Sequence, residues 1–184
     1  STLWPMRQYS TVYAFAHRDA NATAEFIKIE WHADAPVSVG GSVRMTADHL
    51  LWEVSATGAL RVKAAGKFRI GERLAVEHPH THERMHAVVT HVTRQTEAAA
   101  GVFAPNTMLG SIVVDDVQAS CYAYGKHSQD TIHWLFAPLR ALSLVWPAAA
   151  AHMIGAYSWY VRLLMAVRDA LAALLPASLA ATLA

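Results

Sequence analysis

Thr46 and His49 are the pair of residues whose types and spacing most directly suggest chemistry. They stand in the run Thr46-Ala-Asp-His49, which leads into the apolar Leu50-Leu-Trp52. A histidine titrates near neutral pH, and a neighbour that fixes its ring lets it protonate a poor leaving group such as an amide nitrogen. The spacing alone fits equally well a threonine and a histidine that cap a turn.

A histidine cluster is the next candidate, in His78-Pro-His-Thr-His-Glu-Arg-Met-His86. Histidines that alternate along a strand share one face and can bind zinc or copper. Pro79 and the density of charge favour instead an exposed loop at the tip of a hairpin. We therefore predict no metal site, and we expect no resident cofactor.

Cys121 is the single cysteine of the sequence. This excludes an internal disulfide framework and a cysteine-rich zinc site. Free cysteines are usually buried and unreactive, which is the plain alternative to a thiol that takes part in chemistry. The composition is 54% hydrophobic and 16% charged, with a formal net charge of +1. It is typical of a globular protein and provides no basic surface for nucleic acid.

The segments that must position these residues have strand patterns from Tyr9 to about Tyr124. Glu25–Trp31, for example, alternates apolar and polar residues as a half-buried strand does. The strands we predict are Ser10–Phe15, Glu25–Trp31, Val37–Met45, Leu60–Ala64, Arg73–Glu77, Met85–Thr93, Gly101–Ala104, Ser111–Val114 and Gln118–Tyr122. Many short strands with almost no helical periodicity indicate a compact all-β domain.

From about Ser128 the pattern becomes helical. We predict one helix over about Gln129 to Val145, separated by Pro147 from a second that carries an apolar stripe from Tyr157 to Leu174. No Asp, Glu, Lys or Arg occurs between Arg140 and Arg162, a length that suffices to cross a bilayer. Pro147, His152 and Gly155 disfavour a simple span. We expect helices that lie on a membrane or cover an apolar ligand, with packing against the β domain as the alternative.

Several segments resemble the hedgehog-type autoprocessing (Hint) domains. Val43-Arg-Met-Thr-Ala-Asp-His-Leu-Leu51 resembles the strand and turn that hold that family's Thr-x-x-His, and Phe68–Val76 resembles its next turn and strand. Gly101–Ala123 is similar, nearly throughout, to the family's closing hairpin, and His133–Arg140 resembles the start of its helical region. The resemblance implies a mainly β Hint domain over residues 1–127 that lacks the family's first strands, followed by a helical sterol-recognition or membrane-associated region over residues 128–184.

The resemblance also implies a single-turnover reaction in two steps. A cysteine at the front of the domain attacks the preceding peptide carbonyl, which gives a thioester. A sterol hydroxyl then attacks the thioester and releases the upstream segment with cholesterol on its C-terminus. In this interpretation His49 is the acid for the leaving nitrogen, and Thr46 orients His49 or the amide. We expect the nucleophilic cysteine upstream of Ser1.

The family's second proton-transfer residue is where this sequence departs from the pattern. The family has Phe-x-Asp-Arg, and this chain has Phe15-Ala-His-Arg18, so His17 stands at the position of the aspartate. Histidine can also take a proton at neutral pH, although it carries no negative charge. Asp19 is the other candidate, because residues two apart point to the same face of a straight strand. The departure bears on sterol transfer and not on thioester formation.

The remaining expectations concern Cys121 and the partners. By resemblance Cys121 is the family's internal cysteine near the active site. The aromatic residues that we expect to contact sterol or a membrane are Trp134, Trp146, Tyr157, Trp159 and Tyr160. The expected partners are cholesterol or a related sterol as acceptor, the upstream segment in cis and a membrane surface, with no nucleic acid. The expected location is the secretory pathway, including the endoplasmic reticulum, in membrane-associated or extracellular form.

Two other functions stay open at this point. One is a degenerate Hint domain that no longer cleaves and serves as a sterol- or membrane-binding module. The other is a domain that cleaves by hydrolysis and attaches no lipid.

Overall fold

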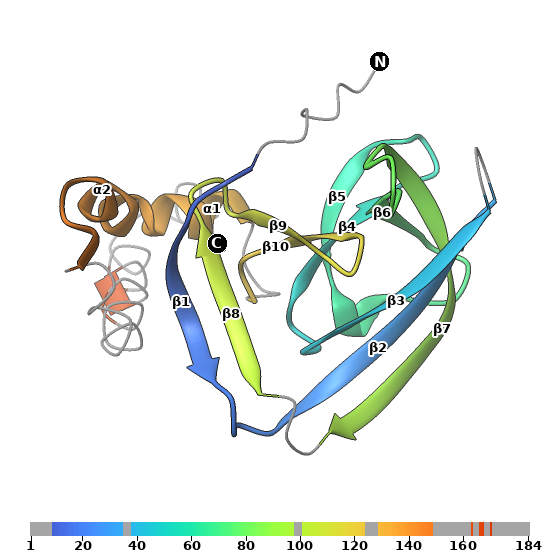
Figure 1. Ribbon diagram of the computed structural model, residues 1–184, viewed down its shortest axis with the longest axis horizontal. Coiled ribbons are helices and arrows are strands. Elements are labelled where there is room, and N and C mark those ends of the chain that lie inside the picture. Colours follow the sequence, from blue (N-terminus) through green and yellow to red (C-terminus); the bar gives the residue numbers. More distant parts are fainter. Residues whose placement is uncertain are drawn as a thin grey trace.

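The computed structural model describes residues 9–34, 38–97, 101–123 and 129–148, together with residues 163, 166, 167 and 170. Within these ranges a strand-rich domain is followed by two short helices (Figure 1). The mainly β fold class predicted from the sequence is confirmed. The strands are β1 Val12–Asp19, β2 Ala24–Ala33, β3 Val39–Met45, β4 Leu50–Val54, β5 Leu60–Ala64, β6 Arg73–Glu77, β7 Arg84–Glu97, β8 Val102–Thr107, β9 Ser111–Val114 and β10 Val117–Ser120.

The larger sheet has the strand order β3-β2-β7-β6-β10-β4-β5, and β9 pairs with β10 beside this path. β2 shows why these residues form strands, because Ile27, Ile29 and Trp31 are buried while the alternating Lys28 and Glu30 are partly exposed. This period of two matches the alternation of side chains across a sheet. Residues from β2, β3, β4, β6, β7 and β10, with Ala65 and Phe68, form the main hydrophobic core.

β1 and β8 form a separate antiparallel pair, with Val12 opposite Thr107 and Asp19 opposite Val102. Figure 1 shows this pair standing apart from β2 and β7, with a short connection from the end of β1 to β2. The pairing joins segments that are far apart in the sequence. It places the end of β1, with His17 and Asp19, beside the start of β8.

The predicted helix over Gln129 to Val145 is two helices, α1 Gln129–Leu135 and α2 Ala137–Val145, with Phe136 between them. Pro138 explains the break, since proline lacks the N–H that would continue the first helix and is tolerated in a helix's first turn. Ile132, Phe136 and Leu139 are buried together with Tyr122, and Tyr13 of β1 packs against them. Through these residues α1 and α2 pack against the β domain. Most of the uncharged run between Arg140 and Arg162, whose placement the sequence left open, lies outside the described residues.

Other differences from the sequence interpretation are small. β4 was not predicted as a strand, and a short 3-10 helix occupies Ala65–Lys67. The predicted helix from Tyr157 to Leu174 and the boundary at residues 127 and 128 lie outside the described residues, apart from isolated positions. Among the helices that are described, none is long and apolar enough to span a bilayer.

Candidate functional site

A cavity of about 500 Å³ is lined by both the β1–β8 pair and the larger sheet, and all five catalytic candidates line it: His17, Asp19, Thr46, His49 and Cys121. They come from the end of β1, the turn after β3 and the residue that follows β10. The apolar part of the lining includes Phe26, Met45, Val102, Phe103, Pro105, Ile112 and Val114. The fold thus brings together side chains that span more than half of the sequence.

The Thr46–His49 segment is a tight turn held from two sides. The backbone N–H of His49 donates to the carbonyl of Thr46 at 3.1 Å, which closes the turn. Ala65 and Gly66 donate their N–H groups to the carbonyls of His49 and Ala47, both at 2.8 Å. Gly66 is needed for this approach, because a Cβ there would lie 3.1 Å from the Cβ of Ala47. The turn therefore presents His49 from a fixed backbone.

One ring nitrogen of His49 forms a hydrogen bond with the backbone, and the other can accept a proton. Nε2 lies 3.0 Å from the carbonyl oxygen of Ser120, which can only accept, so Nε2 carries the hydrogen and Nδ1 keeps its lone pair in the neutral ring. Burial lowers the pKa of His49, and the bond to the Ser120 carbonyl opposes this effect. At neutral pH the ring is therefore an uncharged base with Nδ1 as its basic atom.

Cys121 is held by a chain of hydrogen bonds. The hydroxyl of Thr107 donates to the carbonyl of Ser111 at 2.9 Å, so the thiol, 3.4 Å from Thr107 Oγ1, is left as the donor to that oxygen. The N–H of Cys121 donates to the carbonyl of Gly110 at 2.9 Å. Burial raises the pKa of the thiol. A protonated, buried thiol is a poor nucleophile. No motif in the sequence pointed to this contact of Thr107 with Cys121.

His17 and Asp19 lie at the exposed end of β1 and line the same cavity. This agrees with the expectation that residues two apart on the strand share a face. One carboxylate oxygen of Asp19 accepts the backbone N–H of Asn21 at 2.9 Å. That bond ties Asp19 to the turn between β1 and β2.

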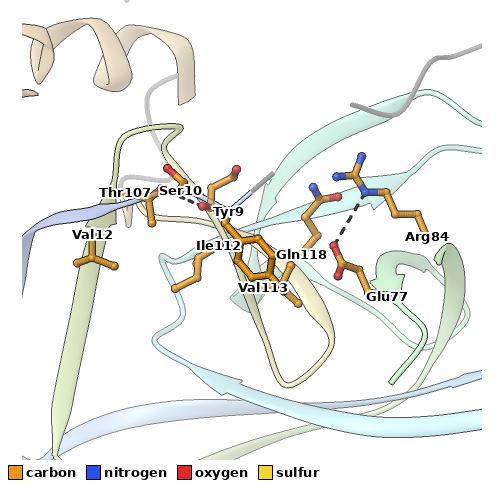
Figure 2. Close-up of a pocket in the computed structure, with 10 residues that line it drawn as sticks. Tyr9, Ser10, Val12, Glu77, Arg84, Thr107, Ile112, Val113 and Gln118 are labelled. Atoms are coloured by element: carbon orange, nitrogen blue, oxygen red, sulfur yellow. Dashed lines mark hydrogen bonds and ion pairs between the residues drawn. The ribbon is translucent and has the colours of Figure 1, made fainter. Parts of the chain in front are cut away.

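A smaller groove of about 250 Å³ is lined by a different set of residues, among them Thr107, Ser111 and Ile112 (Figure 2). Figure 2 shows Tyr9 near Ile112 and Val113 at one end and the ion pair of Glu77 and Arg84, 3.9 Å apart, at the other. None of the residues predicted to be catalytic lines it. Ile112 lines both the groove and the larger cavity.

His78, His80 and His82 of the histidine cluster lie in the turn between β6 and β7, and His86 lies on β7. His78 is buried, and its Nδ1 accepts the backbone N–H groups of His80 and Thr81 at 3.2 and 3.1 Å. Its ring therefore stabilises the turn. Within the part of the chain that the structure describes, no group of three or more His, Cys, Asp or Glu side chains is arranged to hold a metal ion.

Two of the predicted contact aromatics are exposed on the helices. Trp134 of α1 is 75% exposed and Trp146, which follows α2, is 64% exposed. Leu144 and Val145 beside Trp146 are also exposed. Three consecutive large apolar side chains, Leu144, Val145 and Trp146, are therefore exposed at the end of α2. Tyr157, Trp159 and Tyr160 lie outside the described residues.

Comparison with known proteins gives a consistent set of relatives. The family model described as the Hint module matches residues 6–173. Indian hedgehog B protein of Danio rerio is 30% identical over 166 residues, which cover 85% of this chain and 37% of that protein. Protein hedgehog of Drosophila melanogaster is 30% identical over 177 residues, covering 88% of this chain and 36% of that protein. The chain thus spans about a third of the length of these relatives.

A relative matched over a shorter stretch and a solved structure are also similar. Warthog protein 1 of Caenorhabditis elegans is 30% identical over 116 residues, covering 62% of this chain and 22% of that protein. The crystal structure of an intein from a hyperthermophile superimposes with a TM-score of 0.46 at 20% identity, covering 55% of this chain and 58% of that chain.

Proposed function

Because this chain belongs to the Hint family, we propose that it is the self-processing domain of a hedgehog-type precursor. It cleaves the precursor through a thioester at an upstream cysteine and transfers the upstream segment to cholesterol or a related sterol. The family assignment made from the sequence is confirmed by the family match and by the hedgehog relatives. Cysteine dependence and sterol transfer are parts of the proposal.

The observation that carries the proposal is the convergence of the five candidate side chains on one cavity. The cavity combines a fixed neutral histidine, a second histidine at its rim and a largely apolar wall. Proton transfer at two points and room for an apolar acceptor are what the two steps require.

In the first step His49 moves one proton. Its Nδ1 takes the proton of the attacking thiol, the sulfur bonds to the scissile carbonyl carbon, and the resulting imidazolium gives the proton to the amide nitrogen as the C–N bond breaks. The lowered pKa of His49 suits this sequence, since the ring starts neutral and its protonated form is a stronger acid than an ordinary imidazolium.

In the second step a base must accept the proton of the sterol hydroxyl while its oxygen attacks the thioester carbon. A C–O bond forms, the C–S bond breaks, and the sulfur leaves as a thiolate. His17 is the first candidate for this base, because a carboxylate oxygen of Asp19 is already engaged by Asn21. No resident cofactor takes part, and the sterol is the acceptor substrate.

The attacking thiol is proposed to belong to the segment upstream of Ser1. Cys121 is the single cysteine of the sequence, and its thiol is buried and donates to Thr107. The role proposed for Cys121 is that of a second thiol beside the reacting sulfur. The exposed Trp134 and Trp146 support contact of the helical region with a sterol-containing membrane, and the relatives support a location in the secretory pathway.

The test is a cleavage assay on the precursor that includes the residues encoded upstream of Ser1. A small external thiol intercepts a thioester, so we expect thiol-dependent release of the upstream segment by the wild-type precursor and at least about a hundredfold slower release by His49→Ala. The matched control is His86→Ala, an exposed histidine on β7, which should cleave at the wild-type rate. A precursor that folds and never cleaves would overturn the proposal in favour of a binding module.

A further inference from the structure

A hydrogen-bonded cluster joins the helices to the β domain immediately beside the cavity. Tyr122, which follows Cys121, is 1% exposed, and its hydroxyl lies 2.9 Å from His133 Nδ1 on α1. Arg140 of α2 places Nη1 3.3 Å from the same Nδ1 and also donates to the carbonyl of His133. The ring of Tyr122 stacks on Phe136 with centroids 5.6 Å apart. Each of the two helices thus contributes to one small cluster.

The hydrogen bonds fix the protonation state of His133. Arg140 can only donate, and the buried hydroxyl of Tyr122 lies within hydrogen-bond distance of the same nitrogen. Nδ1 accepts from these donors only if it is unprotonated, so the ring is neutral with its hydrogen on Nε2. A proton on Nδ1 would remove the acceptor and set an imidazolium against the Arg140 guanidinium.

The cluster also touches the backbone that holds Cys121. A Cβ on Gly110 would lie 2.6 Å from His133 Nδ1 and 3.1 Å from Tyr122 Cε2, so both rings pack directly against this glycine. The carbonyl of Gly110 accepts the N–H of Cys121 at 2.9 Å. Leu50, next to His49, donates its N–H to the carbonyl of Tyr122 at 3.3 Å. Breaking the hydrogen bonds of the cluster would therefore affect the cavity wall through the backbone at two places, Cys121 and Leu50.

We propose that Tyr122, His133 and Arg140 form a proton-sensitive latch, which holds α1 and α2 on the β domain beside the cavity only while His133 is neutral. The proposal deepens the proposed function, since it adds regulation of the same site by pH. The titratable and charged groups around the latch are Tyr122 and Cys121 after β10, Tyr13 of β1, Asp130 of α1 and Arg140 of α2.

The direction of the pH effect follows from these neighbours. Burial lowers the pKa of His133, the positive charge of Arg140 lowers it further, and Asp130 opposes them. When docking lowers the pKa of a histidine, the neutral ring stabilises the docked state in full at pH values above the histidine's ordinary pKa of 6.5. This stabilisation is lost as the pH falls below 6.5 and through the lowered pKa. Acid therefore opens the latch.

The experiment measures amide hydrogen exchange of α1 and α2 at about pH 8 and about pH 5, on either side of the range in which histidine titrates. The reference is His133→Asn, whose side-chain oxygen accepts in place of Nδ1 and does not titrate. The ratio of wild-type to variant exchange rates cancels the intrinsic effect of pH. We expect a ratio near one at about pH 8 and about tenfold higher at about pH 5, the factor that loss of one buried hydrogen bond produces.

The same ratio at both pH values would overturn the latch. A rise that appears equally in β4 and β5 would also overturn it, because that result means global unfolding. Tyr122→Phe provides a second test, since it removes the hydroxyl that donates to His133 and keeps the ring that stacks on Phe136. We expect faster exchange of the helices in Tyr122→Phe than in the wild type at about pH 8, and unchanged exchange would contradict the proposal. No cleavage is measured, so these outcomes are independent of the proposed function.

Discussion

At the scale of single residues, the cavity places two histidines in different surroundings. His49 is partly buried with Nε2 bound to a carbonyl, whereas His17 is exposed at the rim. A buried ring with a lowered pKa and an exposed ring suit different proton transfers. The two proposed steps can therefore be separated by substituting one histidine at a time.

The pH dependence of thioester formation tests His49. Because its pKa is lowered from 6.5 by burial, the neutral base persists to more acidic pH than for an ordinary histidine. We expect the rate of thiol-dependent cleavage to stay level as the pH falls to 6.5 and to decline only below it. The measurement is the rate of cleavage of the extended precursor across this range. A decline centred above 6.5 would contradict the role of His49 as the starting base.

Substitution of His17 tests the second step. We expect His17→Ala to slow sterol-dependent release by about a hundredfold, the effect of removing one general base, and to leave thiol-dependent release unchanged. Asp19→Asn is the matched comparison and should have a small effect, because Asp19 is engaged by Asn21. Both rates are read from the same gel. A larger loss of sterol-dependent release in Asp19→Asn than in His17→Ala would assign the role of base to Asp19.

At the scale of elements, the connection after β7 supports the end of β1. Gly101 has φ of 76°, and a Cβ there would lie 3.0 Å from Ala20 Cα in the turn that follows Asp19. We expect Gly101→Ala to lower the free energy of unfolding by about 2–4 kcal/mol, from backbone strain and overpacking together. Sterol transfer should fall more than thioester formation.

Gly71→Ala is the control for Gly101→Ala. Gly71 has φ of 89°, but nothing lies within 4 Å of its added Cβ. Gly71→Ala should lower the free energy of unfolding only by the backbone strain, about 1–2 kcal/mol. Urea unfolding of the three proteins gives the comparison. Equal losses for the two variants would show that Gly101 has no special contact with the turn.

The sequence indicated most of the elements but not how they meet. The apolar alternation and turn glycines predicted Leu60–Ala64, Arg73–Glu77 and Ser111–Val114 with the bounds observed. β4 was missed because Leu50-Leu-Trp52 is a short apolar run without alternation. The break at Phe136 was missed because the apolar periodicity continues through it. The pairing of β1 with β8, which brings His17 toward the cavity, is long-range and leaves no local pattern.

At the scale of the whole molecule, the helices present an apolar surface to solvent. Val145 is 82% and Trp146 64% exposed. We expect the double substitution Val145→Ser and Trp146→Ser to weaken binding to cholesterol-containing phosphatidylcholine vesicles by at least about tenfold, from the loss of buried apolar area. Ile70→Ser is the control, because Ile70 is 68% exposed on the β domain. Co-sedimentation measures the binding. Equal binding by all three proteins would contradict a membrane role for this surface.

The most direct test of the account is the mass of the upstream segment released when the extended precursor is incubated with cholesterol and no external thiol. The account predicts a segment heavier than the bare polypeptide by one esterified sterol, formed at a rate that depends on His49. A segment with the mass of the free acid would contradict sterol transfer and would mean that water resolves the thioester in this cavity.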